Sequence, residues 1–282
     1  MLLSHNPTKS LYHYCSTNSF VAILDSRSVW LSSLRLSSDS MEGRHVVKVL
    51  NSLVEHDEFS VEVKKGLLLT VGNIESQLDG LAFCLSEEGD LLSQWRGYAD
   101  DGRGVAIGFS VEYLKLLEQL SRAELPRTFR VLKVEYEESR HADVIESTYS
   151  KLRPLLARGA FGTPWSAKDR ELSELNGDAN RLAVQLMLHF FELKSGAFAE
   201  EREWRLVSHI GMSNANDPCL MRSAAYRIIP YRKLDLIALD PPAISAVVLG
   251  PKHTTPKSVI QTSLKRCGFG DVEVRESKAT YR

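Results

Sequence analysis

The sequence has few of the features that mark secreted, membrane or zinc-binding proteins. Its four cysteines lie far apart and none forms a Cys-x-x-Cys pair, which disfavours zinc sites built on paired cysteines and suits a reducing compartment. No apolar run approaches the roughly 20 residues that cross a bilayer, and the N-terminus lacks the basic and apolar regions of a secretory signal. We therefore expect a cytoplasmic protein without a membrane partner.

Several kinds of catalytic or binding motif are also missing. The eight histidines show neither His-x-x-x-His nor His-Glu-x-x-His spacing, so we expect no metal cofactor. There is no G-x-S-x-G nucleophile elbow. The GRG of residues 102–104 precedes a predicted strand, whereas the dinucleotide-binding fingerprint follows one. A formal net charge of −1 gives no overall field that attracts nucleic acid.

What the sequence does contain indicates a folded chain of mixed secondary structure. Of its 282 residues, 43% are hydrophobic and 25% are charged, and no repeat or Pro-rich linker divides them. Apolar runs and alternating patterns predict strands at residues 11–15, 29–33, 80–86, 103–110, 129–136, 202–207, 235–239, 244–250 and 271–276. Helical spacing predicts helices at residues 16–28, 39–55 and 255–266, and within residues 139–194.

These elements do not follow regular β-α-β alternation, so we expect an α+β fold rather than a doubly wound sheet. We predict a single domain over residues 1–282, with a helical insertion around residues 139–194 that is interrupted near the stretch GTPWSAKD.

The first predicted strand carries a histidine between two tyrosines. His13 lies on the face opposite Tyr12 and Tyr14 if the strand is extended. Its ring is suited to hydrogen-bond a sugar hydroxyl. A structural histidine with an internal hydrogen bond is the alternative.

A second group of candidate residues stands beside the turn DDGRG. Gln94, Trp95, Arg96 and Tyr98 lie close together in the sequence. Aromatic planes beside a guanidinium group could hold a flat heterocycle and a phosphate. The alternative is that the two aromatic residues fill the core and that the arginine pairs with an aspartate of the turn.

The third group is the stretch EREWRLV at residues 201–207. If it is extended, Glu201, Glu203 and Arg205 share one strand face, with the two carboxylates about 7 Å apart. Such carboxylates repel unless a cation or a hydroxyl-rich ligand lies between them. The stretch is therefore either a ligand site or a charged ladder in which Arg205 neutralises both glutamates.

The order of several segments resembles a bacterial family of domains of unknown function, marked by the pattern W-x-x-Y-A-x-x-x-x-G-V-x-I-G-F. The matching segments cover nearly the whole chain and are LYHYCSTNSFVAILDSRSVWLSS, FCLS, QWRGYADDGRGVAIGF, FAEEREWRLV, ISAVVLGPK and a closing YR.

The opening of the chain also resembles ADP-ribosyltransferases, most of all the DNA-targeting toxin type. A strand with a histidine, a short helix ending in IL and a strand ending in Ser-Ser come first, and a glutamate enters a later strand. The resemblance implies an ADP-ribosyltransferase-like split β-sheet with surrounding helices. It also implies NAD as the substrate, and a carboxylate that stabilises positive charge on the ribose needs no metal.

The resemblance implies roles for individual residues. His13 would hold the nicotinamide-side ribose, and an aromatic residue of the block Trp95 to Tyr98 would stack on nicotinamide. Glu203 would bind the ribose 2′-hydroxyl and stabilise the oxocarbenium-like state, while Glu201 matches the E-x-E arrangement of enzymes that modify protein side chains. The predicted catalytic residues are Glu203 and Glu201, and the predicted NAD-binding residues are His13, Tyr98, Trp95, Arg96 and Ser32.

Three functional hypotheses stay open at this point. The chain is an ADP-ribosyltransferase acting as a toxin or phage-defence effector, an NAD glycohydrolase that transfers to water, or a non-catalytic nucleotide sensor. The acceptor, whether protein or nucleic acid, cannot be chosen from the sequence. A toxin or effector of this kind would have an antitoxin or another defence-system protein as its partner.

Overall fold

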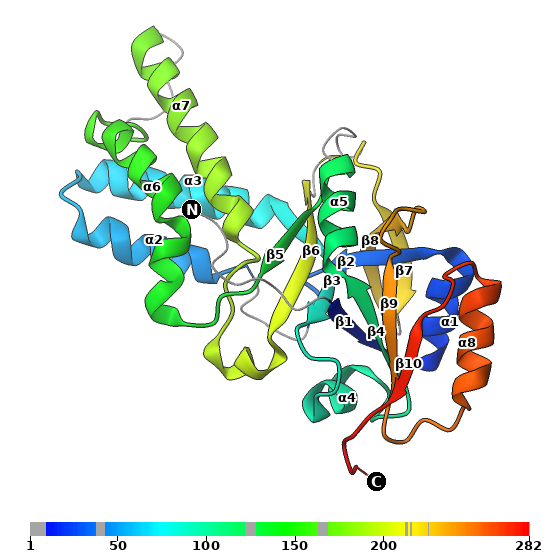
Figure 1. The fold of residues 1–282 in the computed structure, drawn as a ribbon. Helices are drawn as coiled ribbons and strands as arrows, with labels where there is room; N and C mark the ends of the chain where they lie inside the picture. Colours follow the sequence, from blue (N-terminus) through cyan, green and yellow to red (C-terminus); the bar gives the residue numbers. More distant parts are fainter. Residues whose placement is uncertain are drawn as a thin grey trace.

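The computed structural model describes residues 10–37, 43–121, 128–162, 169–211, 214, 216–224 and 226–281. In this part of the chain, strands and helices follow one another irregularly around a mixed, open sheet (Figure 1). This arrangement confirms the predicted α+β class.

The strands form one connected sheet. β9 and β10 pair in parallel, and the pairs from β9 through to β7 are antiparallel. Along the main path the order is β10 (Glu273–Glu276), β9 (Ile244–Leu249), β4 (Val105–Ser110), β1 (Ser10–Cys15), β3 (Leu78–Ser86), β2 (Ser28–Ser33), β8 (Arg227–Asp235) and β7 (Leu220–Ala224). Off this path, β6 (Glu203–Gly211) pairs with β3 and with β5 (Arg130–Lys133).

The sheet divides along β3. One edge of β3 pairs with β6 over its whole length, from Leu78 to Ser86. The other edge is shared, because β2 pairs near Ala82 and β1 pairs only at Ser86. The main-chain carbonyl of Cys84 lies between these two pairings and accepts a hydrogen bond from a side chain, that of His13. This division places β1, β2 and β6 around one point of the sheet.

Both faces of the central strands are buried, which explains the near-continuous apolar sequence of β3. Leu81, Phe83 and Leu85 belong to one hydrophobic cluster with α1 (Thr17–Ser26), α5 (Val111–Ser121) and α8 (Lys257–Arg266). Ala82 and, on β6, Val207 belong to a second cluster on the opposite face.

The second cluster lies under a group of helices that gathers at one end of the molecule (Figure 1). These helices are α2 (His45–His56), α3 (Val61–Gln77), α6 (His141–Ala157) and α7 (Arg170–Leu186), and α2 packs on α3 and α6 while α7 packs on α3 and α6. None of the helices that the structure describes combines the length and the apolar character needed to cross a membrane.

The predicted helical stretch at residues 139–194 contains η1 (Glu138–Arg140), α6, α7 and η2 (Met187–His189). The GTPWSAKD interruption falls mostly on residues 163–168, which lie outside the described residues, as do residues 39–42 of another predicted helix and Arg282 of the closing YR. We did not predict α3, α4 (Leu92–Tyr98), α5, β7 or most of β8.

Two predicted strands differ from the structure. The strand predicted at residues 235–239 is wrong, because β8 ends at Asp235. The next main-chain N–H, that of Leu236, donates to the main-chain oxygen of Arg27, which precedes β2. The strand predicted at residues 129–136 is shorter than expected. Its last part leaves β6 and pairs instead with the chain near Leu193.

Candidate functional site

A cavity of about 290 Å³ lies where the sheet divides. Its walls come from β1, the turn after β2, β3, α4, the segment before β6, and β6 itself. The lining residues are Tyr12, His13, Tyr14, Leu34, Ser37, Cys84, Leu85, Gln94, Tyr98, Lys194, Glu201, Glu203 and Arg205. Four of the predicted site residues, namely His13, Tyr98, Glu201 and Glu203, are therefore brought to one cavity.

His13 is held with one ring nitrogen turned into the divided sheet. Its Nδ1 lies 2.9 Å from the main-chain oxygen of Cys84. Because a carbonyl only accepts, Nδ1 carries the proton and Nε2 is the acceptor of the neutral ring. The ring also stacks on Phe83, with centroids 4.1 Å apart. Burial lowers the pKa of His13 to about 4, so the ring is uncharged at neutral pH and its Nε2 can accept from a hydroxyl.

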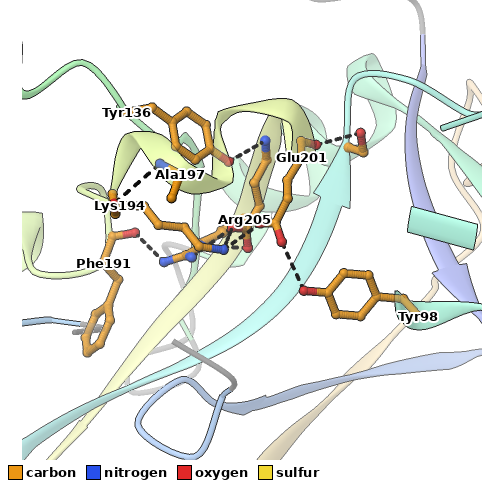
Figure 2. Close-up of polar contacts among 10 residues, drawn as sticks. Tyr98, Tyr136, Phe191, Lys194, Ala197, Glu201 and Arg205 are labelled. Carbon is orange, nitrogen blue, oxygen red and sulfur yellow. Dashed lines mark hydrogen bonds and ion pairs between the residues drawn. The ribbon is translucent and has the colours of Figure 1, made fainter. Parts of the chain in front are cut away.

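Glu203 is the first residue of β6 and lies opposite Ser86 of β3. Arg205 donates to both of its carboxylate oxygens, from Nε to Oε1 at 2.8 Å and from Nη2 to Oε2 at 2.9 Å. Arg205 is itself 1% exposed and also donates from Nη1 to the main-chain oxygen of Phe191 (Figure 2). This is a buried, two-bond ion pair of fixed geometry.

The charge of Glu203 follows from two opposed effects. Burial favours the neutral acid, but Arg205 and Lys194 favour the carboxylate more strongly. Together they lower the pKa of Glu203 to about 2. Glu203 is therefore a carboxylate throughout the neutral pH range.

Glu201 reaches the same cavity by a different route from the one expected. It ends the short helix η3 (Gly196–Glu201), and Arg202 then turns the chain at φ 46° before β6 begins. The prediction that Glu201 and Glu203 share one strand face is therefore wrong. The turn is fixed because Ser86 Oγ donates to the Glu201 carbonyl oxygen at 2.8 Å.

Lys194 joins the two carboxylates. Its Nζ lies 2.5 Å from Glu201 Oε2 and 3.0 Å from Glu203 Oε2. Tyr98 donates its hydroxyl to the other Glu201 oxygen, Oε1, at 3.0 Å (Figure 2). The hypothesis of a ladder neutralised by Arg205 alone is therefore incomplete, since Lys194 supplies the second positive charge.

The other predicted residues of the α4 block lie elsewhere. Trp95 is fully buried, packs edge-on against Tyr14 and donates Nε1–H to Asp90 at 2.8 Å. It therefore cannot stack on a ligand in the cavity. Arg96 is exposed and lies over the ring of Tyr281 at 5.9 Å. Of this block, Tyr98 and Gln94 face the cavity.

Ser32 is also placed away from the lining residues. Its hydroxyl accepts a long hydrogen bond of 3.5 Å from Arg222 Nη2 of β7. The turn that follows β2 supplies Leu34 and Ser37 to the cavity in its place. The Ser-Ser pair at the end of β2 thus comes directly before the turn that lines the cavity and does not itself line it.

Sequence reasoning missed Lys194 and Cys84. Burial and the neighbouring Glu203 carboxylate raise the pKa of the Cys84 thiol well above its usual value. The thiol is therefore protonated, and His13 contacts the Cys84 main chain instead of its sulfur. Together these facts disfavour a cysteine–histidine nucleophile at this site.

A protein-family model described as "Protein of unknown function (DUF2971)" matches residues 94–206. The matched stretch runs from α4 to β6 and contains Tyr98, Lys194, Glu201 and Glu203, while His13 precedes it. The match supports the predicted relation to a domain-of-unknown-function family. Neither curated proteins nor solved structures gave a match. Among the described residues, no three His, Cys, Asp or Glu side chains are grouped as metal ligands.

Proposed function

We propose that this chain is an NAD-dependent ADP-ribosyltransferase and that the cavity at the divided sheet is its active site. The observation that carries the proposal is the meeting of His13 and Glu203 in one cavity from distant parts of the chain. One presents a neutral hydrogen-bond acceptor and the other a fixed negative charge. In this proposal the division along β3 is the split of an ADP-ribosyltransferase-like sheet.

The nicotinamide-ribose half of NAD is the part that suits the cavity. A ribose hydroxyl would donate to His13 Nε2, and Tyr98 would offer its ring to nicotinamide. The cavity is smaller than NAD, since about 290 Å³ is near the lower limit for small-molecule sites. The adenosine half would therefore lie outside it.

The proposed reaction breaks the bond between ribose C1′ and the nicotinamide nitrogen. Nicotinamide leaves with the bonding electron pair, and C1′ gains positive charge as the bond lengthens. The Glu203 carboxylate opposes that charge at a desolvated position, where an electrostatic contribution is largest. An acceptor nucleophile then forms the new bond to C1′ and releases its proton.

Among the described residues, the strong donors to Glu203 do not use all of its acceptor positions. A carboxylate offers about four acceptor positions, and the hydrogen bonds from Arg205 and Lys194 take three of them. The Cys84 thiol also contacts the carboxylate. A thiol is a weak donor, so in this proposal a ribose hydroxyl takes its place when NAD binds.

The experiment is an incubation of purified protein with NAD labelled in its adenylate half, with a cell lysate present. Label retained on protein or nucleic acid supports a transferase and identifies the acceptor class. Free ADP-ribose without transfer indicates a glycohydrolase with the same site. Intact NAD contradicts the proposal and returns the nucleotide-sensor hypothesis. Glu200→Gln is the matched control for Glu203→Gln, because Glu200 is exposed on helix η3, next to Glu201, and lies outside the cavity lining.

The same proposal places the activity in the cytoplasm, where a reducing environment keeps thiols free. All four cysteines are described, and none forms a disulfide.

A further inference from the structure

Lys194 is anchored to the same backbone that holds Glu203. Its main-chain N–H donates to the main-chain oxygen of Glu135 at 3.0 Å, and the Glu135 N–H donates to the main-chain oxygen of Glu192 at 2.7 Å. One residue earlier, the Val134 N–H donates to the main-chain oxygen of Glu203 at 3.0 Å. The main chains of the lysine and the glutamate are thus tied to one short segment, Val134 to Glu135.

The ammonium group of Lys194 is enclosed. The side chain is 7% exposed, its Nζ contacts one oxygen of each glutamate, and it lies 4.7 Å from the centroid of the Phe198 ring. Glu201 and Glu203 are also mostly buried, with side chains 13% and 7% exposed. The two carboxylates share this cation, and Arg205 adds a second positive charge on Glu203 alone.

We propose that Lys194 is a positioning residue that keeps Glu201 and Glu203 ionised together in the cavity. The part of Lys194 in catalysis rests on the proposed function. Its effect on the ionisation of the two carboxylates does not depend on that function. Burial opposes the charge of Lys194 as well, yet the two glutamates raise its pKa, so the cation persists at every pH at which the site would work.

Removal of the lysine charge leaves two mostly buried carboxylates that had both contacted the same Nζ. A pair in that state binds one shared proton at a pH where each member alone would be ionised. Arg205 still neutralises one charge, so the pair as a whole takes up a single proton. The titratable and charged groups that face the pair from the surrounding elements are His13, Cys84, Tyr98, Tyr136, Lys194 and Arg205.

The test compares Lys194→Met with the double variant Lys194→Met/Glu201→Gln. Carboxyl ¹³C NMR of glutamate-labelled protein follows the pair, and Glu201→Gln and Glu203→Gln identify its two signals. In Lys194→Met we expect the pair to titrate at least about one pH unit above its wild-type midpoint. In the double variant Glu201 no longer carries a like charge, so this upward shift should disappear.

Two control variants and one comparison of folding complete the test. Lys194→Arg keeps the charge and should titrate as the wild type does. Lys133→Met removes a partly exposed lysine that pairs with Glu87 outside the cavity lining, and should leave the pair unchanged. If Lys194→Met does not fold, the proposal predicts that the double variant does, because its buried charges are balanced again.

Catalysis is the second readout. The acid limb of kcat/KM for NAD cleavage should move upward with the carboxyl titration in Lys194→Met and return in the double variant. If wild-type protein leaves NAD intact, the proposed function fails while the NMR titration still tests Lys194. An unchanged titration in Lys194→Met, or a double variant that is unfolded too, would overturn the role assigned to Lys194.

Discussion

Replacing Glu203 with glutamine removes one negative charge from the cavity and leaves the size of the side chain almost unchanged. Glu203 is 5% exposed and accepts from Arg205 and Lys194. If its charge opposes the developing oxocarbenium ion, NAD cleavage should fall by about 10²-fold or more, which corresponds to about 3 kcal/mol. NAD binding should fall much less, because the interaction strengthens mainly in the transition state.

The structure adds a cost in stability to this change. Arg205 is 1% exposed and would lose its charged partner. Breaking a buried ion pair by removing one partner typically costs about 3–5 kcal/mol. The comparison must therefore separate lost folding from lost chemistry.

Arg205→Met and the double variant provide that separation. Arg205→Met breaks the same pair and should destabilise the fold similarly, but it keeps the Glu203 charge. Glu203→Gln/Arg205→Met leaves neither half of the pair unpaired and should regain much of the melting temperature without regaining NAD cleavage. Nicotinamide release is measured below the melting temperature of every variant. Activity that follows stability across the three variants, rather than the Glu203 charge, would refute this reasoning.

Further predictions concern the other walls of the cavity and the effect of pH. His13→Ala should weaken NAD binding by about 3- to 10-fold, the value of one hydrogen bond, and equal affinity by calorimetry would remove His13 from the site. Cys84→Ala should lower the KM for NAD and Cys84→Ser should raise it, since only serine offers a stronger competing donor to Glu203; a shift in the same direction would argue for a packing effect alone. Tyr98→Phe should keep nicotinamide stacking and Tyr98→Ala should lose it, a difference of about 3- to 10-fold in affinity. Burial lowers the pKa of His13 and of His209 to about 4. Between about pH 6.5 and 4 the unfolded chain therefore binds more protons than the folded one, and the melting temperature should fall as the pH is lowered through that window. The contribution of Glu203, whose pKa is lowered to about 2, should be lost only below about pH 4.5; an unchanged melting temperature between pH 6.5 and 4.5 would contradict the histidine assignment.

The predictable part of the fold is the part that local pattern determines. β1, β3, β4 and β9 follow from apolar or alternating runs, because each buries at least one face against a hydrophobic cluster. The helix after β1 follows from a cap, since Ser16 accepts from the Ser19 N–H. In contrast, β7 is largely exposed and carries little apolar signal.

The site was predictable only where its residues lie on such elements. His13 on β1 and Glu203 on β6 could be placed by strand pattern and resemblance. Lys194 could not, because its role depends on a pairing between Glu135 and Leu193 that no local pattern encodes. For Trp95 the core-filling alternative is correct, because Tyr14 of β1 packs against it, and that contact joins residues far apart in the sequence.

The central claim is that this cavity cleaves NAD with the help of the Glu203 charge. Nicotinamide release in the presence of a cell lysate, compared among wild type, Glu200→Gln and Glu203→Gln, tests it most directly. The account predicts release by the wild type and by Glu200→Gln at similar rates, and a loss of about 10²-fold or more in Glu203→Gln. Equal release by all three proteins, or none by the folded wild type, would contradict it.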